Sequence, residues 1–284
     1  MTARTAVPLY WCRYGRAEAT PMVVLHGGPG ASHDYLLPQL LSLSELGDGF
    51  DLVFYDQRGG GRSKTDDPAP ITVATHVADF EAVTAELGVH GAGVVGYSWG
   101  ALLAMHVVSE ARARGAVSLL PPWMVLLSPA PFLPDDRAAF EAEFQRRQLS
   151  PAVAGLRAEL QQSGLREQDL EAYRQRAFEL SVAGYFAHPE TSSNLTPFRV
   201  QGRVQQSTWD SVRGAELMAA LPAVHVPTLV VHGDRDPIPV ASARATAAAL
   251  GAQFVELADC GHVPYVEQPV ALRAALEVFI ALEA

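Results

Sequence analysis

The chain has 284 residues, of which 49% are hydrophobic and 18% charged, and this balance predicts a folded domain with a large core. Its formal net charge of -10 argues against nucleic acid and anionic membrane surfaces as partners, because both require clustered positive charge. The two cysteines, Cys12 and Cys260, have no metal-ligand spacing and are too few for a disulfide framework. Residues 1–16 lack the pattern of a signal peptide and no apolar run suits a membrane helix, so we expect a cytoplasmic protein.

Short apolar runs rich in β-branched residues alternate along the chain with longer segments of helical periodicity. The runs predict buried strands at Met22–Leu25, Leu52–Tyr55, Val94–Gly96, Met124–Leu127, Thr228–His232 and Phe254–Leu257. The segments predict helices at Val73–Leu87, Ala101–Arg114, Ala241–Leu250 and Val270–Leu282. Continuous hydrophobicity without polar alternation is typical of a sheet covered by helices on both faces. We therefore predict an α/β fold with a mostly parallel sheet, and Tyr10–Tyr14 as an antiparallel strand at its edge.

The alternation stops between Pro134 and Leu221, a stretch rich in Glu, Gln and Arg. Helical patterns occur there at Ala138–Leu149, Val153–Gln162 and Gln168–Leu180, followed by a more irregular piece at His188–Thr208. Because predicted strands flank it, we interpret residues 134–221 as a helical cap inserted into a core domain of residues 1–133 and 222–284. Open α/β sheets bind ligands at their carboxyl edge, so we expect the cap to lie there. The alternative is a peripheral helical bundle remote from any site.

A glycine-rich loop with the sequence HGGPG, residues 26–30, follows the predicted strand Met22–Leu25. Such a loop can approach another group closely and direct a backbone N–H outward, as acyl transfer requires at the developing oxyanion. We expect the backbone N–H groups of Gly28 and Trp99 to form this oxyanion hole. A phosphate-binding loop is the alternative, but neither GK[ST] nor GxGxxG is present. His26 is predicted to hydrogen-bond within the loop and to take no part in catalysis.

The next motif is GxSxG at residues 96–100, between a predicted strand and a predicted helix. It places Ser98 on a sharp turn, where the close approach of neighbouring segments requires glycine two positions before and two positions after. The turn exposes the hydroxyl, and the following helix points its N-terminal N–H groups toward developing negative charge. Since short motifs recur by chance, the flanking strand and helix carry the interpretation of Ser98 as a nucleophile. The alternative is a structural serine in a βα turn.

Two later loops supply the imidazole and the carboxylate that a serine nucleophile needs. His262 comes directly after the last predicted strand and is the expected general base, whereas His106, His225 and His232 lie on or beside predicted helices and strands. Two aspartates, Asp234 and Asp236, compete for the role of the acid in the loop after Thr228–His232. No histidine pair has the spacing of a metal site with a nearby carboxylate, and we expect neither a metal nor a cofactor.

Three motifs in this order resemble the proline iminopeptidase (prolyl aminopeptidase) branch of the α/β-hydrolase superfamily. They are HGGPG at 26–30, the segment DQRGGGRS at 56–63 and GYSWG at 96–100. The resemblance implies the α/β-hydrolase fold and favours Asp236 over Asp234, since family members carry the acid three residues after the glycine that ends the strand. It also implies that Asp56 and Arg58 brace the loops around the site. Dehalogenases and epoxide hydrolases of this fold carry Asp where this chain has Ser98, so their chemistry is not expected.

The resemblance implies removal of an N-terminal residue, typically proline, from small peptides. Such an enzyme holds the α-ammonium group of its substrate with carboxylates. In the family these include a cap glutamate in a motif like Asn-Glu-Phe, but here the stretch reads Pro-Phe-Arg at 197–199, and only the Trp209-Asp210 pair is kept. Arg199 instead places a positive charge there. The glutamates that we consider as replacements in substrate binding are Glu141, Glu143 and Glu190.

The sequence therefore leaves three functions open. The first is a prolyl-aminopeptidase-like hydrolase of small peptides. The second is a hydrolase of esters, or of carbon–carbon bonds in small diketones, that uses the same triad without an amine pocket. The third is a non-catalytic binding protein, against which the intact set of Ser98, Asp236 and His262 argues. Carboxylates facing the pocket from the cap would separate the first function from the second.

Overall fold

The computed structural model of the chain describes residues 2–4, 8–16 and 18–283, so both ends of the predicted core domain, residues 1 and 284, lie outside the described part. Within it, eight strands form one sheet in the order β1-β2-β4-β3-β5-β6-β7-β8. The strands are β1 (Thr2–Arg4), β2 (Tyr10–Tyr14), β3 (Thr20–Leu25), β4 (Phe50–Tyr55), β5 (Gly93–Tyr97), β6 (Met124–Leu127), β7 (Thr228–Gly233) and β8 (Gln253–Leu257). From β4 through β8 all neighbours are parallel. The prediction of a mostly parallel α/β sheet is confirmed.

Both edges of the sheet differ from the prediction. Tyr10–Tyr14 is an antiparallel strand but not an edge strand, because β2 pairs with β4 on one side and with β1 on the other. β1 has only three residues, too few to leave a pattern in the sequence. At the opposite edge, β8 is not buried as predicted: only Leu257 is buried, and Phe254 and Val255 are partly exposed. An edge strand has one neighbour, so less of its surface is covered.

Helices cover both faces of the sheet, and successive residues of the strands alternate between two cores. The helices predicted between the strands are confirmed as α1 (Val73–Glu86), α2 (Trp99–Ala113), α9 (Val240–Leu250) and α11 (Pro269–Glu283). In β3, Val23 and Leu25 pack into a core shared with α1, α2 and α9. Met22 and Val24 face the other core, which contains Leu276 of α11. This two-sided burial is why the strands read as continuous apolar runs.

Local signals fix where some of these helices begin and end. α1 begins after Thr72, whose hydroxyl accepts the backbone N–H of Thr75 while the Thr75 hydroxyl accepts that of Thr72. This reciprocal cap satisfies N–H groups that have no partner inside the helix. α9 ends at Gly251, which adopts the left-handed conformation that closes many helices. The turn then returns the chain to the sheet at β8.

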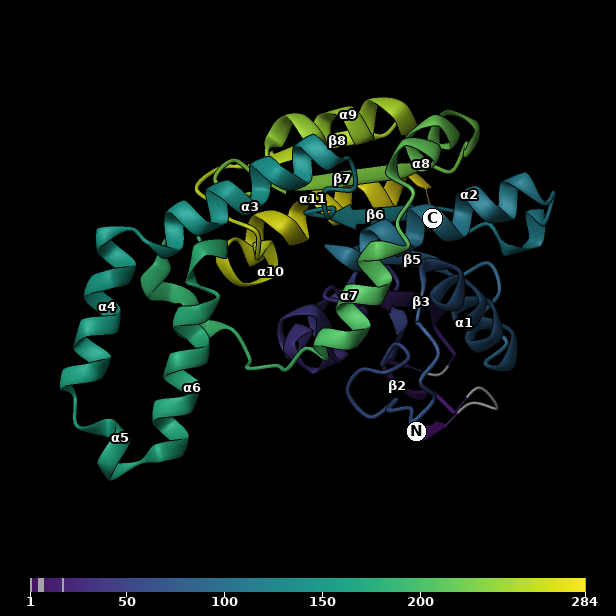
Figure 1. Cartoon of the computed structure of the whole chain (residues 1–284). Helices are drawn as coiled ribbons and strands as arrows, with labels where there is room; N and C mark the ends of the chain where they lie inside the picture. The colour runs from purple at the N-terminus through teal and green to yellow at the C-terminus, as the bar shows by residue number, and fades with distance from the viewer. Residues whose placement is uncertain (1, 5–7, 17, 284) are drawn as a thin grey trace.

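The segment between β6 and β7 is helical, and we call residues 134–221 the inserted segment. Its helices are α3 (Pro134–Gln148), α4 (Pro151–Gln162), α5 (Leu165–Gln168), α6 (Leu170–Ser181), α7 (Gly202–Asp210) and α8 (Gly214–Ala220). The piece at 188–208, predicted to be irregular, runs into α7, whose polar sequence buries only Val204 and Thr208. In Figure 1, α4, α5 and α6 project away from the sheet. Among the described residues, no helix combines the length and apolar character that crossing a membrane requires.

Candidate active site

Ser98 lies on the sharp turn between β5 and α2. Its backbone has φ 52° and ψ -115°, a conformation that residues with side chains rarely adopt. The flanking glycines allow the turn, because a Cβ on Gly96 would overlap the backbone of Ala101 and a Cβ on Gly100 would overlap the carbonyl oxygen of Leu25. The GxSxG spacing thus has a steric cause, and it presents the Ser98 hydroxyl at the carboxyl end of the central strand.

We expect Gly100→Ala to destabilise the protein by about 3 kcal/mol, because the added methyl group has to displace backbone and not a flexible side chain. The matched control is Gly155→Ala in the middle of α4, where no atom lies within 4 Å of an added Cβ. That substitution should stabilise the protein by about 0.5–1 kcal/mol, since alanine favours helix more than glycine does. Chemical or thermal unfolding measures both. A Gly100→Ala protein as stable as the wild type would contradict this packing of the turn.

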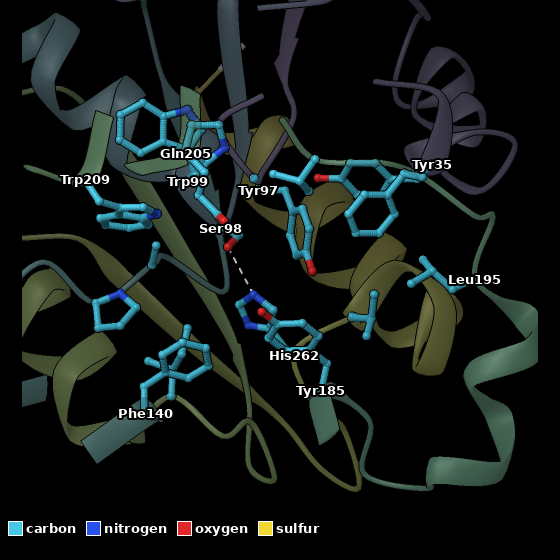
Figure 2. Close-up of a pocket in the computed structure, with 18 of the residues that line it drawn as sticks. Tyr35, Tyr97, Ser98, Trp99, Phe140, Tyr185, Leu195, Gln205, Trp209 and His262 are labelled. Atoms are coloured by element: carbon cyan, nitrogen blue, oxygen red, sulfur yellow. Dashed lines mark hydrogen bonds between the residues drawn. The ribbon is translucent and has the colours of Figure 1, made fainter. Parts of the chain in front are cut away.

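Two loops bring an imidazole and a carboxylate to Ser98. His262 follows β8, and its Nε2 lies 3.1 Å from the Ser98 Oγ (Figure 2). Its Nδ1 lies 2.9 Å from Oδ2 of Asp236, which follows β7. The second oxygen of Asp236 accepts the backbone N–H of Ile238 at 2.8 Å. The three predicted side chains therefore form one continuous hydrogen-bonded chain, the arrangement by which a carboxylate orients an imidazole toward a hydroxyl.

The carboxylate of Asp236 is held in its ionised form. Burial alone would raise its pKa, but the nearby imidazoles of His262 and His232 outweigh burial, and the pKa of Asp236 lies below its ordinary value. His232 Nε2 is 3.7 Å from the carboxylate and donates to the carbonyl oxygen of Ile238 at 3.0 Å. We did not predict a role at the site for His232. Its position four residues before Asp236, at the end of the same strand, is the signal that could have revealed it.

Asp234, the competing aspartate, is exposed and does not contact the imidazole. Its carboxylate accepts the backbone N–H of Cys260 at 3.1 Å and so ties the loop after β7 to the loop after β8. The structure thus brings Asp236, and not Asp234, to His262.

The glycine-rich loop and the start of α2 both border the cavity in front of Ser98. Gly28, with φ 61°, and Trp99 line the same cavity as Ser98. Trp99 is the first residue of α2, so its N–H has no acceptor inside the helix. The loop is fixed from behind: the Tyr35 hydroxyl accepts a backbone hydrogen bond from Gly27, and His26 accepts the N–H of Gln57 at 3.1 Å. Burial lowers the pKa of His26 to about 4, so its imidazole is neutral.

Asp56 and Arg58 anchor the loops that surround the site. Asp56 is fully buried and accepts the backbone N–H groups of His33 and Arg62, at 3.0 and 2.8 Å. Arg58 Nε donates to Asp79 of α1 at 2.8 Å. The His33 ring also contacts Asp56, at 2.7 Å, and the Cys12 Sγ, at 3.1 Å. Burial opposes the charged imidazole, but these hydrogen bonds raise the pKa of His33 to about 9.

The cavity in front of Ser98 has a volume of about 130 Å³, and eight of the twenty described residues that line it are aromatic. The aromatic residues are Tyr35, Tyr97, Trp99, Phe140, Tyr185, Phe198, Trp209 and Tyr265. Figure 2 shows Phe140 and Trp209 on one side of the Ser98–His262 pair and Tyr35 and Leu195 on the other. Among the described residues that line the cavity there is no aspartate or glutamate, and Arg137 and His262 are the only basic ones. The walls suit flat or apolar groups and offer no carboxylate to an ammonium group.

The three glutamates considered for substrate binding lie elsewhere. Glu141, 60% exposed, pairs with Arg137, and Glu143 pairs with Arg146 and Arg147 on the surface of α3. Glu190 is 64% exposed beside His188. None of the three lines the cavity, and neither does Arg199. Its neighbour Phe198 does, with its ring centre 4.4 Å from that of Tyr35. Glu141 instead lines a second hollow beside the cavity, together with Arg137, so none of the three glutamates forms the wall in front of Ser98.

The inserted segment also holds the loop that carries His262. The carbonyl oxygen of Tyr185 accepts the backbone N–H of His262 at 2.7 Å, and the two rings stack at 5.0 Å. The carboxylate of Glu267 accepts the N–H groups of Ala187 and Gly261, at 2.7 and 2.8 Å. Neither Tyr185 nor Glu267 was predicted to lie at the site. Tyr185 lies in a short 3₁₀ turn without a recognisable motif, and Glu267 reads as an ordinary helix residue.

Comparison with known proteins places this geometry in a family. The family model described as the alpha/beta hydrolase fold matches residues 20–269. The chain belongs to the α/β-hydrolase family. A model that spans nearly the whole sequence includes the loops of Ser98, Asp236 and His262 together with the inserted segment.

Individual relatives of this α/β hydrolase confirm the resemblance to proline iminopeptidases. The proline iminopeptidase of Lactobacillus helveticus is 36% identical over 107 residues, which cover 37% of this chain and 36% of the relative. The match thus spans little more than a third of the relative's length. A proline iminopeptidase-related protein from Thermus thermophilus has a TM-score of 0.74 at 23% identity, covering 100% of this chain and 98% of its own. A thermophilic esterase from Thermogutta terrifontis has a TM-score of 0.63 at 21% identity, covering 99% and 98%. At these identities the two structures establish the fold alone.

Proposed function

We propose that this α/β hydrolase is a serine hydrolase that works through an acyl-enzyme. The observation that carries the proposal is the hydrogen-bonded chain from Asp236 through His262 to Ser98, which ends at a cavity. Ser98 is the nucleophile, His262 the general base and Asp236 the group that fixes the tautomer of the imidazole. The described residues contain no cluster of three or more His, Cys, Asp or Glu side chains suited to a metal ion, and the mechanism needs none.

In the first half-reaction, the Ser98 Oγ attacks the carbonyl carbon of the substrate while His262 Nε2 takes its proton. The carbonyl oxygen becomes an oxyanion, to which the N–H groups of Gly28 and Trp99 donate. The imidazolium then gives the proton to the leaving group, and the acyl group stays on Ser98. In the second half-reaction, His262 takes a proton from water, the hydroxide attacks the acyl-enzyme, and the acid leaves as Ser98 regains its proton.

We further propose that residues 134–221 act as a cap domain over this site, inserted into the core of 1–133 and 222–284. The support is that the cap supplies a large part of the cavity wall, including Arg137 and Phe140 of α3 and Trp209 of α7. A cap that shapes the cavity would determine which substrates reach Ser98.

Two substrate classes compete. Similarity to proline iminopeptidases over 107 residues supports release of an N-terminal residue from small peptides. The cavity supports the other class, esters or small diketones, because a desolvated α-ammonium group needs carboxylates and the described walls carry a guanidinium instead. We infer that the substrate has no free α-ammonium group, and we favour a small ester or a diketone over a peptide.

The two classes separate when proline p-nitroanilide and p-nitrophenyl esters of acetic and butyric acid are assayed side by side, with Ser98→Ala as the blank. We expect ester turnover that depends on Ser98, and none of the proline anilide. Efficient release of p-nitroaniline from the proline substrate would overturn the ester assignment in favour of the aminopeptidase. If neither the proline anilide, nor the esters, nor a small diketone assayed in the same way is turned over in a Ser98-dependent manner, the serine hydrolase itself is contradicted.

A further inference from the structure

Arg137 is the one guanidinium among the described residues that line the cavity of Ser98. It belongs to the first turns of α3, and its side chain is 33% exposed. Among the described residues that line this cavity, His262 is the only other basic one, and none is acidic. The electrostatic character of the cavity therefore depends on this side chain.

Two neighbours fix the orientation of the Arg137 guanidinium. The Arg137 Cζ lies 4.2 Å from the ring centre of Trp209, so the guanidinium is placed over the indole. Its Nε donates to the Glu141 carboxylate at 2.6 Å. Among the described residues, this is the one hydrogen bond of the Arg137 side chain, and the two terminal nitrogens form none. A guanidinium held in this way keeps two parallel donors available, which is the geometry that binds a carboxylate in bidentate fashion.

The position of Arg137 connects the inner cavity with the outside. Arg137, Gln205 and Trp209 line both the cavity of Ser98 and an adjoining groove of about 440 Å³. Gln205 and Trp209 lie four residues apart on α7 and so share one face of that helix. Trp209 in turn packs edge-on against Trp99, the residue after the nucleophile, with ring centres 5.7 Å apart. Arg137 therefore borders both hollows, and the described lining of the groove also includes the carboxylates of Glu141 and Asp210.

We propose that Arg137 binds a carboxylate of the substrate, so that the natural substrate is an ester or a diketone that also carries a free acid group. The inference rests on the proposed serine hydrolase and names its substrate class. Glu141 does not cancel the attraction, because it engages Nε only and its carboxylate is 60% exposed to screening water. The cavity thus selects for the charge opposite to that of a peptide N-terminus.

Matched ester pairs test the proposal. One series compares p-nitrophenyl half-esters of glutaric, adipic and pimelic acid with neutral p-nitrophenyl esters of the same chain length. A second pair, p-acetoxybenzoate and phenyl acetate, puts the carboxylate on the leaving group. We expect kcat/KM of the wild type to favour the acid in at least one pair, and Arg137→Gln to reduce that preference by about 10–100-fold, the value of a charge-assisted hydrogen bond. Arg137→Lys keeps the positive charge but not the two parallel N–H donors, so it should reduce the preference for the acidic ester less than Arg137→Gln does.

The matched control is Arg146→Gln on the same helix, whose side chain is 70% exposed and paired with Glu143 away from the cavity. It should leave the preference unchanged. Two results would overturn the proposal. The first is a wild type whose kcat/KM is higher for the neutral ester in every pair. The second is an Arg137→Gln protein whose kcat/KM falls by the same factor for the acidic and the neutral ester. The second result would mean that Arg137 only supports Trp209.

Binding without turnover separates this inference from the proposed function. Calorimetry measures the affinity of Ser98→Ala and of Ser98→Ala/Arg137→Gln for monomethyl adipate and p-acetoxybenzoate. Weaker binding by the double variant supports the carboxylate site even if the wild type hydrolyses no ester. Equal binding by both proteins rejects the site even if the neutral esters are hydrolysed well.

Discussion

Replacing Ser98 by alanine is expected to lower kcat for ester hydrolysis by about 10³–10⁶-fold, because the acyl-enzyme cannot form without the hydroxyl. The backbone strain at this position remains, so the free energy of unfolding should change little. Steady-state assays with p-nitrophenyl butyrate measure the loss. Mass spectrometry after a brief reaction should find an acyl group on the wild type and none on Ser98→Ala.

Ser109→Ala is the matched control for the nucleophile. Ser109 lies on α2, the helix that Ser98 precedes, and its hydroxyl is buried without a hydrogen-bond partner among the described residues. Its removal should leave kcat unchanged. If Ser98→Ala kept more than about a tenth of the wild-type kcat, Ser98 would not be the nucleophile.

Asp236→Asn is expected to lower kcat by about 10²–10⁴-fold while leaving the fold intact. The asparagine amide has nearly the same shape as the carboxylate, but it can donate to His262 Nδ1 and so favour the tautomer that carries its proton on Nε2. That tautomer cannot accept the proton of Ser98. The buried amide also provides no negative charge to stabilise the imidazolium.

The same loop provides the control for this change. Asp234→Asn keeps a carbonyl oxygen that can accept the N–H of Cys260, and Asp234 is exposed and does not touch the imidazole. Its kcat should stay within about threefold of the wild type, the range of ordinary surface substitutions. Equal losses in the two variants would place the catalytic carboxylate elsewhere.

The fold was predictable from the sequence wherever burial on two sides leaves an unbroken apolar run. The central strands meet that condition, and every predicted one is present. β1 was missed because three residues leave no pattern, and the burial of β8 was overestimated because an edge strand has only one neighbour. α7 escaped because its nine residues bury only two side chains, so no apolar period marks it.

The residues of the candidate site were also predictable only where a sequence motif marks them. Ser98 stands between two glycines, and His262 follows a glycine in the loop after the last predicted strand, and both patterns are visible in a single sequence. Tyr185 contacts His262 across a tertiary interface, and nothing in its own neighbourhood indicates this. The wall of the cavity is also a tertiary property. The sequence drew attention to Arg199, yet the cation in the cavity is Arg137 from another helix.

The hydrogen bond from the His262 backbone N–H to the Tyr185 carbonyl oxygen joins the inserted segment, which lines part of the cavity, to the loop of the proposed general base. A chimera that exchanged residues 134–221 for the equivalent part of another hydrolase would replace the wall of the cavity and also remove the support of the base. A chimera could retain the short stretch Ala183–Tyr185 and the two residues after it, which include the N–H that Glu267 accepts. The loop that carries His262 would then keep its contacts with the inserted segment. Directed evolution of new substrate ranges would then best vary α3 and α7 and leave this stretch untouched.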